Sequence, residues 1–433
     1  MVAAMQQKVR SGYKQTEVGM IPAEWNVDAL ASVTPRNVRN GIVDGPFGSN
    51  LKTIHYRKSG IPIITSGYVT EGRFIADSYL YVDKEKFEEE KRSAVEPGDI
   101  VMAKIGARCG ASAILPHWHQ TGILSGNALK ITVDESRHST LYVWQVLWDL
   151  YSTGGIESLR TVGAQPAISM AQLKKYKVAL PPLPEQHAIS AALSDVDTLI
   201  AALDSLIAKK RDIKQATMQQ LLTGKQRLPG FSGKWEIIMM AEDSVLKARI
   251  GWQGLTTAEY LKTGDYYLVT GTDFINGRVN WASCCFVDKN RYSQDRNIQL
   301  RVGDVLLTKD GTIGKVGYVD TLPGPTTLNS GVFVIRPKDD RYDPLCFYYV
   351  MTSQIFGEFL AKLQAGSTIS HLYQKDFVNF EFSAPPLPEQ TAIAAVLSDM
   401  DADIAALEAS REKTQALKQG MMQQLLTGNI RLL

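Results

Sequence analysis

The chain has 433 residues, of which 44% are hydrophobic and 21% are charged, and its 47 Lys and Arg against 45 Asp and Glu leave a net charge of +2. Such a chain has enough apolar surface to bury two or three globular cores, so a disordered or fibrous protein is excluded. The near-neutral balance also excludes a chain that coats nucleic acid over its whole surface, but it leaves room for a local basic patch.

No apolar stretch of signal-peptide length occurs near the N-terminus, and no run of about 18 apolar residues is present to span a membrane. We therefore expect a cytoplasmic protein without a membrane partner. Four cysteines lack the spacing of a zinc site or a disulfide framework, and we expect free thiols: Cys109, Cys284, Cys285 and Cys346. His117 and His119 resemble a metal pair, but turn or surface histidines are the favoured interpretation, so no metal site is expected.

The sequence contains an internal repeat with a period of 204 residues. Pro-Pro-Leu-Pro-Glu-Gln at 181–186 returns at 385–390, and Met-Gln-Gln-Leu-Leu-Thr-Gly at 218–224 returns at 422–428. Between 181 and 224, 27 of 44 positions are identical in the second copy, whereas the regions between the blocks repeat more loosely. A period of this length indicates duplicated domains and not a solenoid.

Taken in chain order, the repeat predicts an N-terminal segment (1–20), a first variable domain (21–180), a central long helix (181–228), a second variable domain (229–384) and a C-terminal long helix (385–433). Within the domains, β-prone runs bounded by Gly, Pro, Asp or Asn favour short strands. Strands are expected at 61–64, 80–82, 100–102 and 129–133, and at 266–269, 305–307, 316–319 and 332–335. Helices are expected at 141–151 and 345–359, so each domain is predicted to be α+β.

The repeated blocks predict long helices, because prolines cluster ahead of Glu185 and Glu389 and none follows before the capping positions Gly224 and Gly428. A helix from 185 to 222 would be about 57 Å long. Its apolar residues follow the 4-3 spacing of a coiled-coil seam: Ile189, Leu193, Val196, Ile200, Leu203 and Ile207, repeated as Ile393, Leu397, Met400, Ile404 and Leu407. We expect an α+β fold with a pseudo-two-fold duplication, in which the helices pair as an antiparallel coiled coil. An ordinary amphipathic helix packed on a domain is the alternative.

Motifs of catalysis are missing from the sequence. Residues 311–316 come nearest to a phosphate-binding P-loop, but the glycine spacing is wrong and no hydroxyl residue follows the lysine. The chain has no Asn/Asp-Pro-Pro-aromatic tetrad of the kind used in base methylation, and no glycine-rich cofactor fingerprint follows a predicted strand. We therefore expect no catalytic residue on this chain.

The duplicated Pro-Pro-Leu-Pro-Glu-Gln blocks closely resemble those of the specificity subunit of type I restriction–modification systems, and the likeness covers nearly the whole chain. It includes variable regions that end in 163–169 and 365–370, the Leu-Leu-Thr-Gly exit of each helix, and the Gly-Asp motifs at 97–100 and 302–305. The resemblance implies that each variable region is a target recognition domain that reads one half of a bipartite site in double-stranded DNA. It also implies that the paired helices set the distance between the half-sites.

Two methyltransferase subunits are implied as partners on the repeated helices, joined by restriction subunits with helicase and nuclease activity. The resemblance places S-adenosylmethionine, ATP and magnesium on those partners, so this chain is expected to be a non-catalytic subunit. Residues 21–180 contain 18 Lys and Arg against 16 Asp and Glu, and residues 229–384 contain 16 against 17. Positive charge must then gather on one face, with partners supplying much of the phosphate contact. Lengthening the first helix by about four residues after Leu203, about 6 Å, should change the preferred spacer.

Base readout needs basic or amide side chains on loops that reach the major groove. The candidates are Lys52, Tyr68, Arg73, Lys104 and Arg108 in the first domain, and Trp252, Gln253, Arg278, Lys309 and Lys315 in the second. Lys104 and Lys309 are favoured, because each follows a predicted strand and precedes glycines that would let phosphate approach the backbone. Two other interpretations stay open: a coiled-coil scaffold that joins two protein-binding domains, and a self-contained DNA enzyme.

Overall fold

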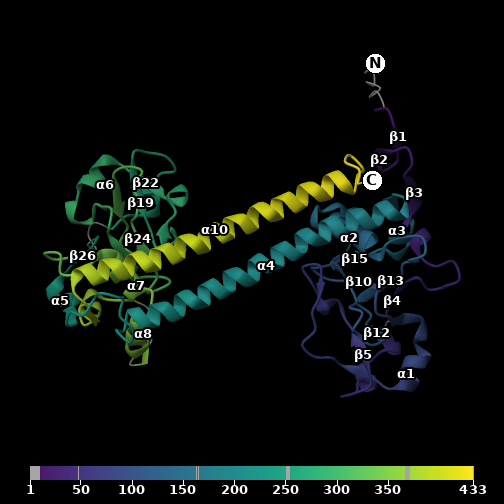
Figure 1. The fold of residues 1–433 in the computed structure, drawn as a ribbon, viewed down its shortest axis with the longest axis horizontal. Coiled ribbons are helices and arrows are strands. Elements are labelled where there is room, and N and C mark those ends of the chain that lie inside the picture. The colour runs from purple at the N-terminus through teal and green to yellow at the C-terminus, as the bar shows by residue number, and fades with distance from the viewer. Residues whose placement is uncertain are drawn as a thin grey trace. The chain divides into compact units, whose positions relative to one another are not determined.

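The computed structural model describes residues 10–46, 48–161, 163, 165–249, 254–365 and 371–432 (Figure 1). The chain divides into two compact units, of which the first contains residues 1–202 and 411–433 and the second contains residues 203–410. The two long helices have the same length of 39 residues, α4 from Leu183–Leu221 and α10 from Leu387–Leu425. Each unit therefore combines one variable domain with the start of the long helix that follows it and the end of the other long helix.

The first unit contains many short strands and three helices ahead of α4 among its described residues. They are β1 (Tyr13–Thr16), β2 (Gly19–Pro22), β3 (Asn26–Ala29), β4 (Ile42–Asp44), β5 (Ile61–Ile64), β6 (Val69–Thr70), β7 (Arg73–Phe74), β8 (Tyr81–Val82), α1 (Lys84–Glu89), β9 (Ala94–Val95), β10 (Ile100–Ala103), β11 (Ser112–Ile114), β12 (Gly122–Leu124), β13 (Ala128–Ile131), α2 (Thr140–Ser152), β14 (Arg160–Thr161), β15 (Ala167–Ile168), α3 (Met170–Lys175) and β16 (Lys177–Leu180). Two four-stranded sheets form the domain, ordered β11-β10-β13-β4 and β8-β5-β12-β9.

The second unit repeats this plan. Its elements between the long helices are β17 (Glu236–Met239), α5 (Met240–Asp243), β18 (Ser244–Ala248), β19 (Tyr266–Val269), β20 (Phe274–Ile275), β21 (Arg278–Val279), β22 (Cys285–Val287), α6 (Lys289–Ser293), β23 (Val305–Thr308), β24 (Val316–Tyr318), β25 (Thr326–Leu328), β26 (Val332–Pro337), α7 (Pro344–Met351), α8 (Gln354–Ala365), α9 (Gln374–Phe377) and β27 (Glu381–Ala384). Its sheets are ordered β18-β26-β23-β24-β21-β20 and β22-β19-β25. The smaller sheet of the second domain and one sheet of the first contain equivalent parallel pairs, β19 with β25 and β5 with β12, and the larger sheet of the second domain adds a parallel pair of β21 with β24.

The hydrophobic cores extend from the domains into the ends of the long helices. In the first unit, Ile189 and Leu193 at the start of α4 pack in one cluster with Trp25 of the domain and with Met422 and Leu425 at the end of α10. Within this unit the start of one helix thus lies against the end of the other, so the two run antiparallel. Burial of these apolar side chains contributes about 25 cal/mol per Å² toward holding the helices on the domain.

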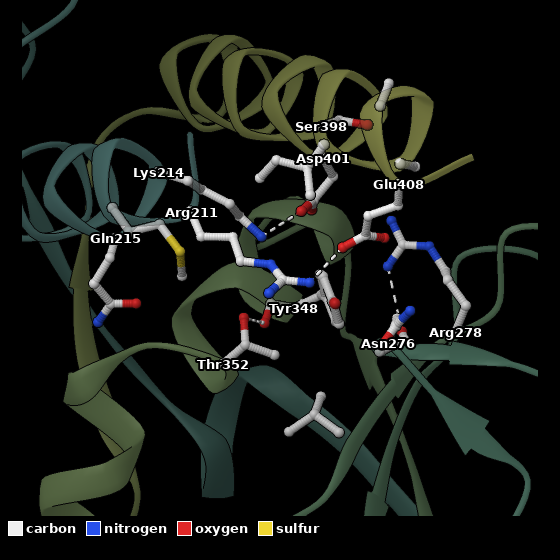
Figure 2. A pocket seen from close by; sticks show the side chains of 16 residues that line it. Arg211, Lys214, Gln215, Asn276, Arg278, Tyr348, Thr352, Ser398, Asp401 and Glu408 are labelled. Carbon is white, nitrogen blue, oxygen red and sulfur yellow. Dashed lines mark hydrogen bonds and ion pairs between the residues drawn. The ribbon is translucent and has the colours of Figure 1, made fainter. Parts of the chain in front are cut away.

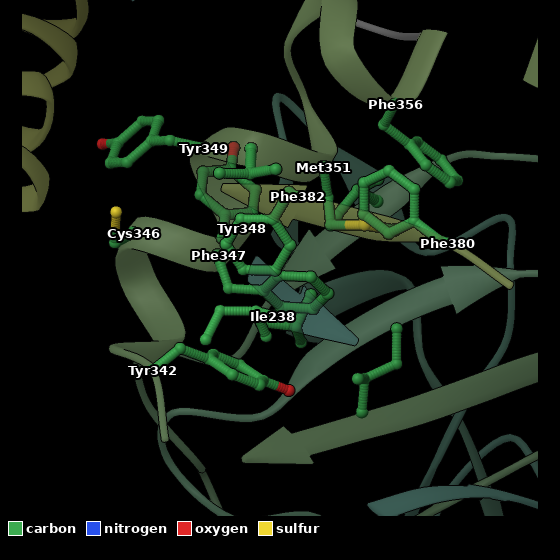
Figure 3. Close-up of a cluster of buried hydrophobic side chains, with 14 of the residues drawn as sticks. Ile238, Tyr342, Cys346, Phe347, Tyr348, Tyr349, Met351, Phe356, Phe380 and Phe382 are labelled. Atoms are coloured by element: carbon green, nitrogen blue, oxygen red, sulfur yellow. The ribbon is translucent and has the colours of Figure 1, made fainter. Parts of the chain in front are cut away.

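The second core is rich in aromatic side chains from α7, α8 and β27 (Figure 3). Phe347 and Phe380 lie in the same cluster as Ile393 and Leu397 at the start of α10, and as Leu221 at the end of α4. Aromatic rings bury large apolar areas and favour tilted or edge contacts, as between Phe347 and the ring of Phe382 with centroids 5.6 Å apart. The two units therefore fix the helix ends by the same arrangement with different side chains.

All eight predicted strand runs fall on strands, with boundary differences of one or two residues. The expected helix at 141–151 is confirmed as α2, and both long helices begin and end close to the predicted positions. The single helix expected at 345–359 is wrong, because α7 ends at Met351 and α8 begins at Gln354. Ser353 separates them, and its hydroxyl accepts a hydrogen bond from the backbone N–H of Ile355. A serine side chain that satisfies a free helical N–H favours a new helix start over continuation.

Across the described parts of the chain, no helix combines the length and the apolar character that a membrane crossing requires. The four cysteines are free thiols, as expected, with Cys109, Cys284 and Cys346 buried and Cys285 partly exposed. Burial, with smaller contributions from Asp273 and Cys285, raises the pKa of Cys284 to about 12.

Thiol titration tests this burial. Because the thiolate is the reactive form, Cys285 should react with a thiol reagent in the native protein at about pH 8, and the three buried thiols should react only after unfolding. In the unfolded chain Cys284 returns to its ordinary pKa of 9.0 and releases a proton that the native state keeps. The free energy of unfolding should therefore fall as pH rises above about 9. Cys285→Ser should remove the fast reaction. Any fast-reacting thiol that remains in the native form of that variant would contradict the burial of the other three cysteines.

Candidate nucleic-acid interface

Loops from several strands meet at one end of the first domain, which we call its loop end. The backbone N–H of Ser125 donates to the carbonyl of Ile64 over 2.9 Å, which joins the loop before β13 to the loop after β5. The N–H of Lys104 donates to Asn127 over 2.8 Å, and the carbonyl of Lys104 accepts from Ile168 over 2.8 Å. Lys104 therefore links three loops through its backbone. Loops held on a rigid sheet in this way form a surface that can vary in sequence without loss of the fold.

The loop end of the second domain repeats these bonds at equivalent positions. The N–H of Asn329 donates to Val269 over 3.0 Å, and the N–H of Lys309 donates to Gly331 over 2.9 Å. The carbonyl of Lys309 accepts from Leu372 over 2.9 Å. The two lysines favoured from sequence thus occupy matching places at the centre of the two loop ends.

Their side chains lie in different surroundings. The ammonium of Lys104 is 2.5 Å from Asp44 Oδ2, and the side chain is largely buried. The ammonium of Lys309 lies over the ring of Phe333, 5.3 Å from its centroid. A buried lysine that faces a carboxylate is stabilised as an internal ion pair, whereas a cation over an aromatic ring keeps more of its charge available.

The other first-domain candidates have separate roles in the structure. Tyr68 packs against Phe74 with ring centroids 5.7 Å apart, and burial raises the pKa of its phenol. Arg108 is exposed and donates to the carbonyl of Val69 over 3.2 Å. Arg73 is exposed on the β6–β7 hairpin, and Lys52 is exposed before a short 3-10 turn. Lys52, Arg73 and Arg108 therefore present charge to solvent, whereas Tyr68 belongs mainly to the packing.

In the second domain, Lys315 is exposed in the β23–β24 loop, and Trp252 and Gln253 lie outside the described residues. Arg278 lies over the rings of Tyr318 and Tyr348, with its guanidinium 5.1 and 4.8 Å from the centroids. The same arginine lines a cavity of about 700 Å³ between β20–β21, α7 and the second unit's parts of α4 and α10 (Figure 2). Arg278 thus faces the helices of its own unit.

Charged pairs join the two helices in that cavity. Lys214 of α4 lies 2.5 Å from Asp401 of α10, and Arg211 lies 2.5 Å from Glu408 (Figure 2). Asp401 also accepts a hydrogen bond of 2.9 Å from the hydroxyl of Tyr349. In the first unit, Lys418 pairs with Asp197 over 2.6 Å, so the Lys–Asp pair is duplicated along with the helices. Exposed pairs of this kind contribute up to about 1 kcal/mol each, so they adjust the helix pairing more than they create it.

The repeated Gly-Asp motifs have a structural role. Asp99 is buried, and its carboxylate accepts from the N–H of Glu96 over 2.8 Å and from the ammonium of Lys130 over 2.9 Å. Its counterpart Asp304 accepts two hydrogen bonds of 2.6 Å from Arg336. These carboxylates fix the turns that lead into the central strands β10 and β23, which end at the loop ends.

A buried carboxylate fastens the start of α4 to the segment that follows α10. Glu185 has no exposed surface, and its Oε1 accepts from Arg431 Nε over 2.5 Å. Its Oε2 accepts from Arg431 over 2.9 Å and from the indole N–H of Trp25 over 2.9 Å. Gly428, which has a φ of +72°, lets the chain turn after α10, and a side chain there would collide with Pro22. We call this arrangement of Glu185, Arg431 and Trp25 the first clasp.

The second clasp repeats it in the other unit. Glu389 at the start of α10 is buried and accepts two hydrogen bonds from Arg227, which follows α4, one of them 2.6 Å long. The guanidinium of Arg227 lies over the ring of Trp235, 5.8 Å from its centroid. Sequence reasoning missed both arginines, although each stands three residues after the glycine of the repeated Leu-Leu-Thr-Gly exit.

The glutamine of the repeated motif fastens the helix to the domain. Gln186 accepts from the backbone N–H of Ser139 over 2.9 Å and donates to the carbonyl of Pro181 over 2.9 Å. Gln390 does the same with Asp343 and Pro385, over 3.0 and 2.8 Å. Ser139 and Asp343 are the N-caps of α2 and α7. The Pro-Pro-Leu-Pro-Glu-Gln motif is therefore explained as a junction between each long helix and its domain.

No group of three or more His, Cys, Asp or Glu within the described residues is arranged to hold a metal ion. His119 is buried, with Nε2 3.0 Å from the hydroxyl of Tyr79 and Nδ1 2.6 Å from the carbonyl of Gln120. Both ring nitrogens therefore lie within hydrogen-bond distance of protein groups.

The fold is that of a duplicated two-domain protein, and comparison with known proteins identifies its family. The model of the type I restriction modification DNA specificity domain matches the chain twice, over residues 49–210 and 254–419. This chain belongs to the family of type I restriction–modification specificity subunits. The predicted internal duplication and the mixed α and β content are thereby confirmed.

Relatives match the chain over nearly its whole length. It is 24% identical over 445 residues to the putative type I restriction enzyme MjaX specificity subunit of Methanocaldococcus jannaschii, covering 100% of this chain and 99% of the relative. It is 23% identical over 436 residues to the type I restriction enzyme EcoBI specificity subunit of Escherichia coli, covering 93% and 87%. The crystal structure of the type I S subunit from M. genitalium shares the fold, with a TM-score of 0.57, 13% identity and coverage of 97% and 98%. A second structure, from work on complex assembly and conformational transition of the type I R-M system, has a TM-score of 0.56, 16% identity and coverage of 95% and 99%.

Removing one clasp arginine should destabilise the second unit. Arg227→Ala would leave the carboxylate of Glu389, which is 1% exposed, without its cation, and a buried charge without a partner destabilises the fold. We expect a lower urea midpoint for the transition that carries the second unit. Lys225→Ala, an exposed lysine two residues away, is the matched control and should change the free energy of unfolding by no more than about 0.5 kcal/mol. Equal midpoints for the two variants would show that the clasp is not a major stabilising contact.

Proposed function

We propose that this chain is the sequence-specific DNA-recognition subunit of a type I restriction–modification complex. Each domain reads one half of a bipartite site, and the helices, pairing as an antiparallel coiled coil, set the separation of the halves. The observation that carries the proposal is the contrast between the two kinds of repeated element. The Glu–Arg pairs of the clasps and the glutamine junctions of the helices are the same in both units, whereas the side chains at the two loop ends differ.

That contrast suits a subunit whose specificity changes while its framework stays the same. The bonds that hold the loop ends together are mostly backbone bonds, which do not depend on the side chains of the loops. The side chains are then free to differ between domains and to present different donors and acceptors to base edges in the major groove. Lys52, Arg73, Arg108 and Lys315 are exposed and are the described candidates best placed for contact with DNA.

The long helices support the role of a spacer. Each contains 39 residues, which corresponds to about 58 Å at 1.5 Å per residue. Of the predicted seam residues, Ile189, Leu193 and Ile207 in α4 and Ile393, Leu397 and Ile404 in α10 are buried, and the remaining ones are partly buried. A stiff connection of fixed length would reject half-sites at the wrong separation, because both domains could not bind them together.

Partners supply the chemistry in this proposal. Two methyltransferase subunits, which bind S-adenosylmethionine, would dock on the duplicated helical region, and restriction subunits would bring ATP- and magnesium-dependent translocation and cleavage. The chain itself would act without a cofactor. Its charge of +2 supports a division of labour in which this subunit selects the sequence and the partners contribute much of the contact with phosphates.

Mapping of methylated adenines in a host that expresses the chain with its methyltransferase partner tests the proposal. We expect one motif made of two short defined halves separated by a spacer of constant length and undefined sequence. Replacing residues 229–384 with the corresponding domain of a relative should change one half and leave the other half and the spacer as they were. A single contiguous motif would contradict the assignment of one half-site to each domain. Stable assembly without any sequence preference would instead favour a scaffold.

A further inference from the structure

The β23–β24 loop of the second domain, residues 309–314, is held open by a buried hydroxyl. Thr308 is 1% exposed, and its Oγ1 donates to the carbonyl of Thr312 over 2.5 Å and accepts from the N–H of Lys315 over 2.9 Å. The backbone of Thr308 also accepts from Gly314 over 3.0 Å. One side chain thus fixes both sides of the loop.

Backbone donors without a described acceptor lie between two lysines in this loop. Among the described residues, none accepts a hydrogen bond from the four successive backbone N–H groups of residues 310–313. Lys309 and Lys315 flank them, the first with its ammonium over an aromatic ring and the second exposed. At Gly311, which has a φ of +67°, a side chain would meet no atom within 4 Å, so the space in front of the backbone is open. The carboxylate of Asp310 is turned to His371, with 2.5 Å between Oδ1 and Nδ1.

The equivalent loop of the first domain, residues 104–110, is closed instead. Its N–H groups donate inward, Gly106 to Pro166 over 3.1 Å and Cys109 to Gly106 over 2.9 Å. The counterpart of Thr308 is Ala103, which has no hydroxyl. Lys104 is paired with Asp44, as described above. The loop of the second domain therefore leaves four successive N–H groups without an acceptor among the described residues, whereas the loop of the first domain uses those of Gly106 and Cys109 internally.

We propose that the β23–β24 loop binds one phosphate group of the DNA backbone, through its free N–H groups and the ammonium groups of Lys309 and Lys315. Successive backbone N–H groups beside lysines form a concave site for an anion, and glycine lets a phosphate oxygen approach closely. The inference rests on the proposed DNA-recognition function. It adds that the two domains hold DNA unequally: the second domain anchors the backbone at this loop, and the first domain's closed loop does not.

The test uses the assembled complex and the salt dependence of its binding to duplex DNA. Each phosphate contact contributes about one unit to the slope of log K against log salt concentration. Lys315→Gln should lower that slope by about one and leave the base sequence of both half-sites unchanged. Lys289→Gln, an exposed lysine of α6 in the same domain, is the matched control and should keep the wild-type slope. Thr308→Ala should weaken binding in the same uniform way, because it releases the loop.

Neutral methylphosphonates placed singly along the half-site of the second domain locate the contact. At one position the substitution should weaken wild-type binding more than it weakens binding by Lys315→Gln, because that variant has already lost part of the contact. An unchanged slope in that variant, or an altered base preference, would overturn the proposal. The salt slope is also measured on a duplex that lacks the bipartite site, because a phosphate contact does not depend on base sequence. This measurement tests the loop even if no bipartite site is found. In a last measurement, inorganic phosphate is added at constant ionic strength. Strong competition with DNA by this phosphate would identify a site for free anions instead.

Discussion

A buried glutamate bound to an arginine is the contact on which the architecture depends. Glu185 and Glu389 begin the two long helices and are almost completely buried, so each needs a cation and hydrogen bonds to offset its desolvation. Arg431 and Arg227 provide both, and each arrives from the segment that follows the other long helix. The chain must therefore bring the start of one helix to the end of the other in each unit, which requires the helices to run antiparallel.

This contact also explains which parts of the chain repeat closely. Proline, glutamate and glutamine at the helix entry, and glycine and arginine after the exit, serve one junction made twice. Loss of either arginine would leave a buried carboxylate without its cation, and a side chain in place of Gly428 would collide with Pro22. The loop ends are joined mostly by backbone bonds, so fewer of their side chains are constrained in this way. The proposed division between a constant framework and variable reading surfaces thus follows from where the buried polar groups lie.

Much of the fold could be predicted from the sequence, because period and pattern are local properties. The β-prone runs became β5, β10, β19 and β23, and the proline-free blocks became α4 and α10. Contacts between distant residues could not be predicted in the same way. The pairing of Arg431 with Glu185 joins residues 246 positions apart, and that of Lys104 with Asp44 joins residues 60 positions apart. The helix expected at 345–359 failed for a local reason, the capping hydroxyl of Ser353, which apolar periodicity does not register.

The central claim is that clasped helices of matched length set the distance between two independent readers of DNA. The direct test inserts four residues after Leu203 and four after its counterpart Leu407, about 6 Å in each helix, and maps the methylated motif. With both insertions, both clasps can still form, and the account predicts unchanged half-sites separated by a longer spacer. A single insertion should instead disturb a clasp and lower stability. An unchanged spacer in the stable double-insertion protein would contradict the account.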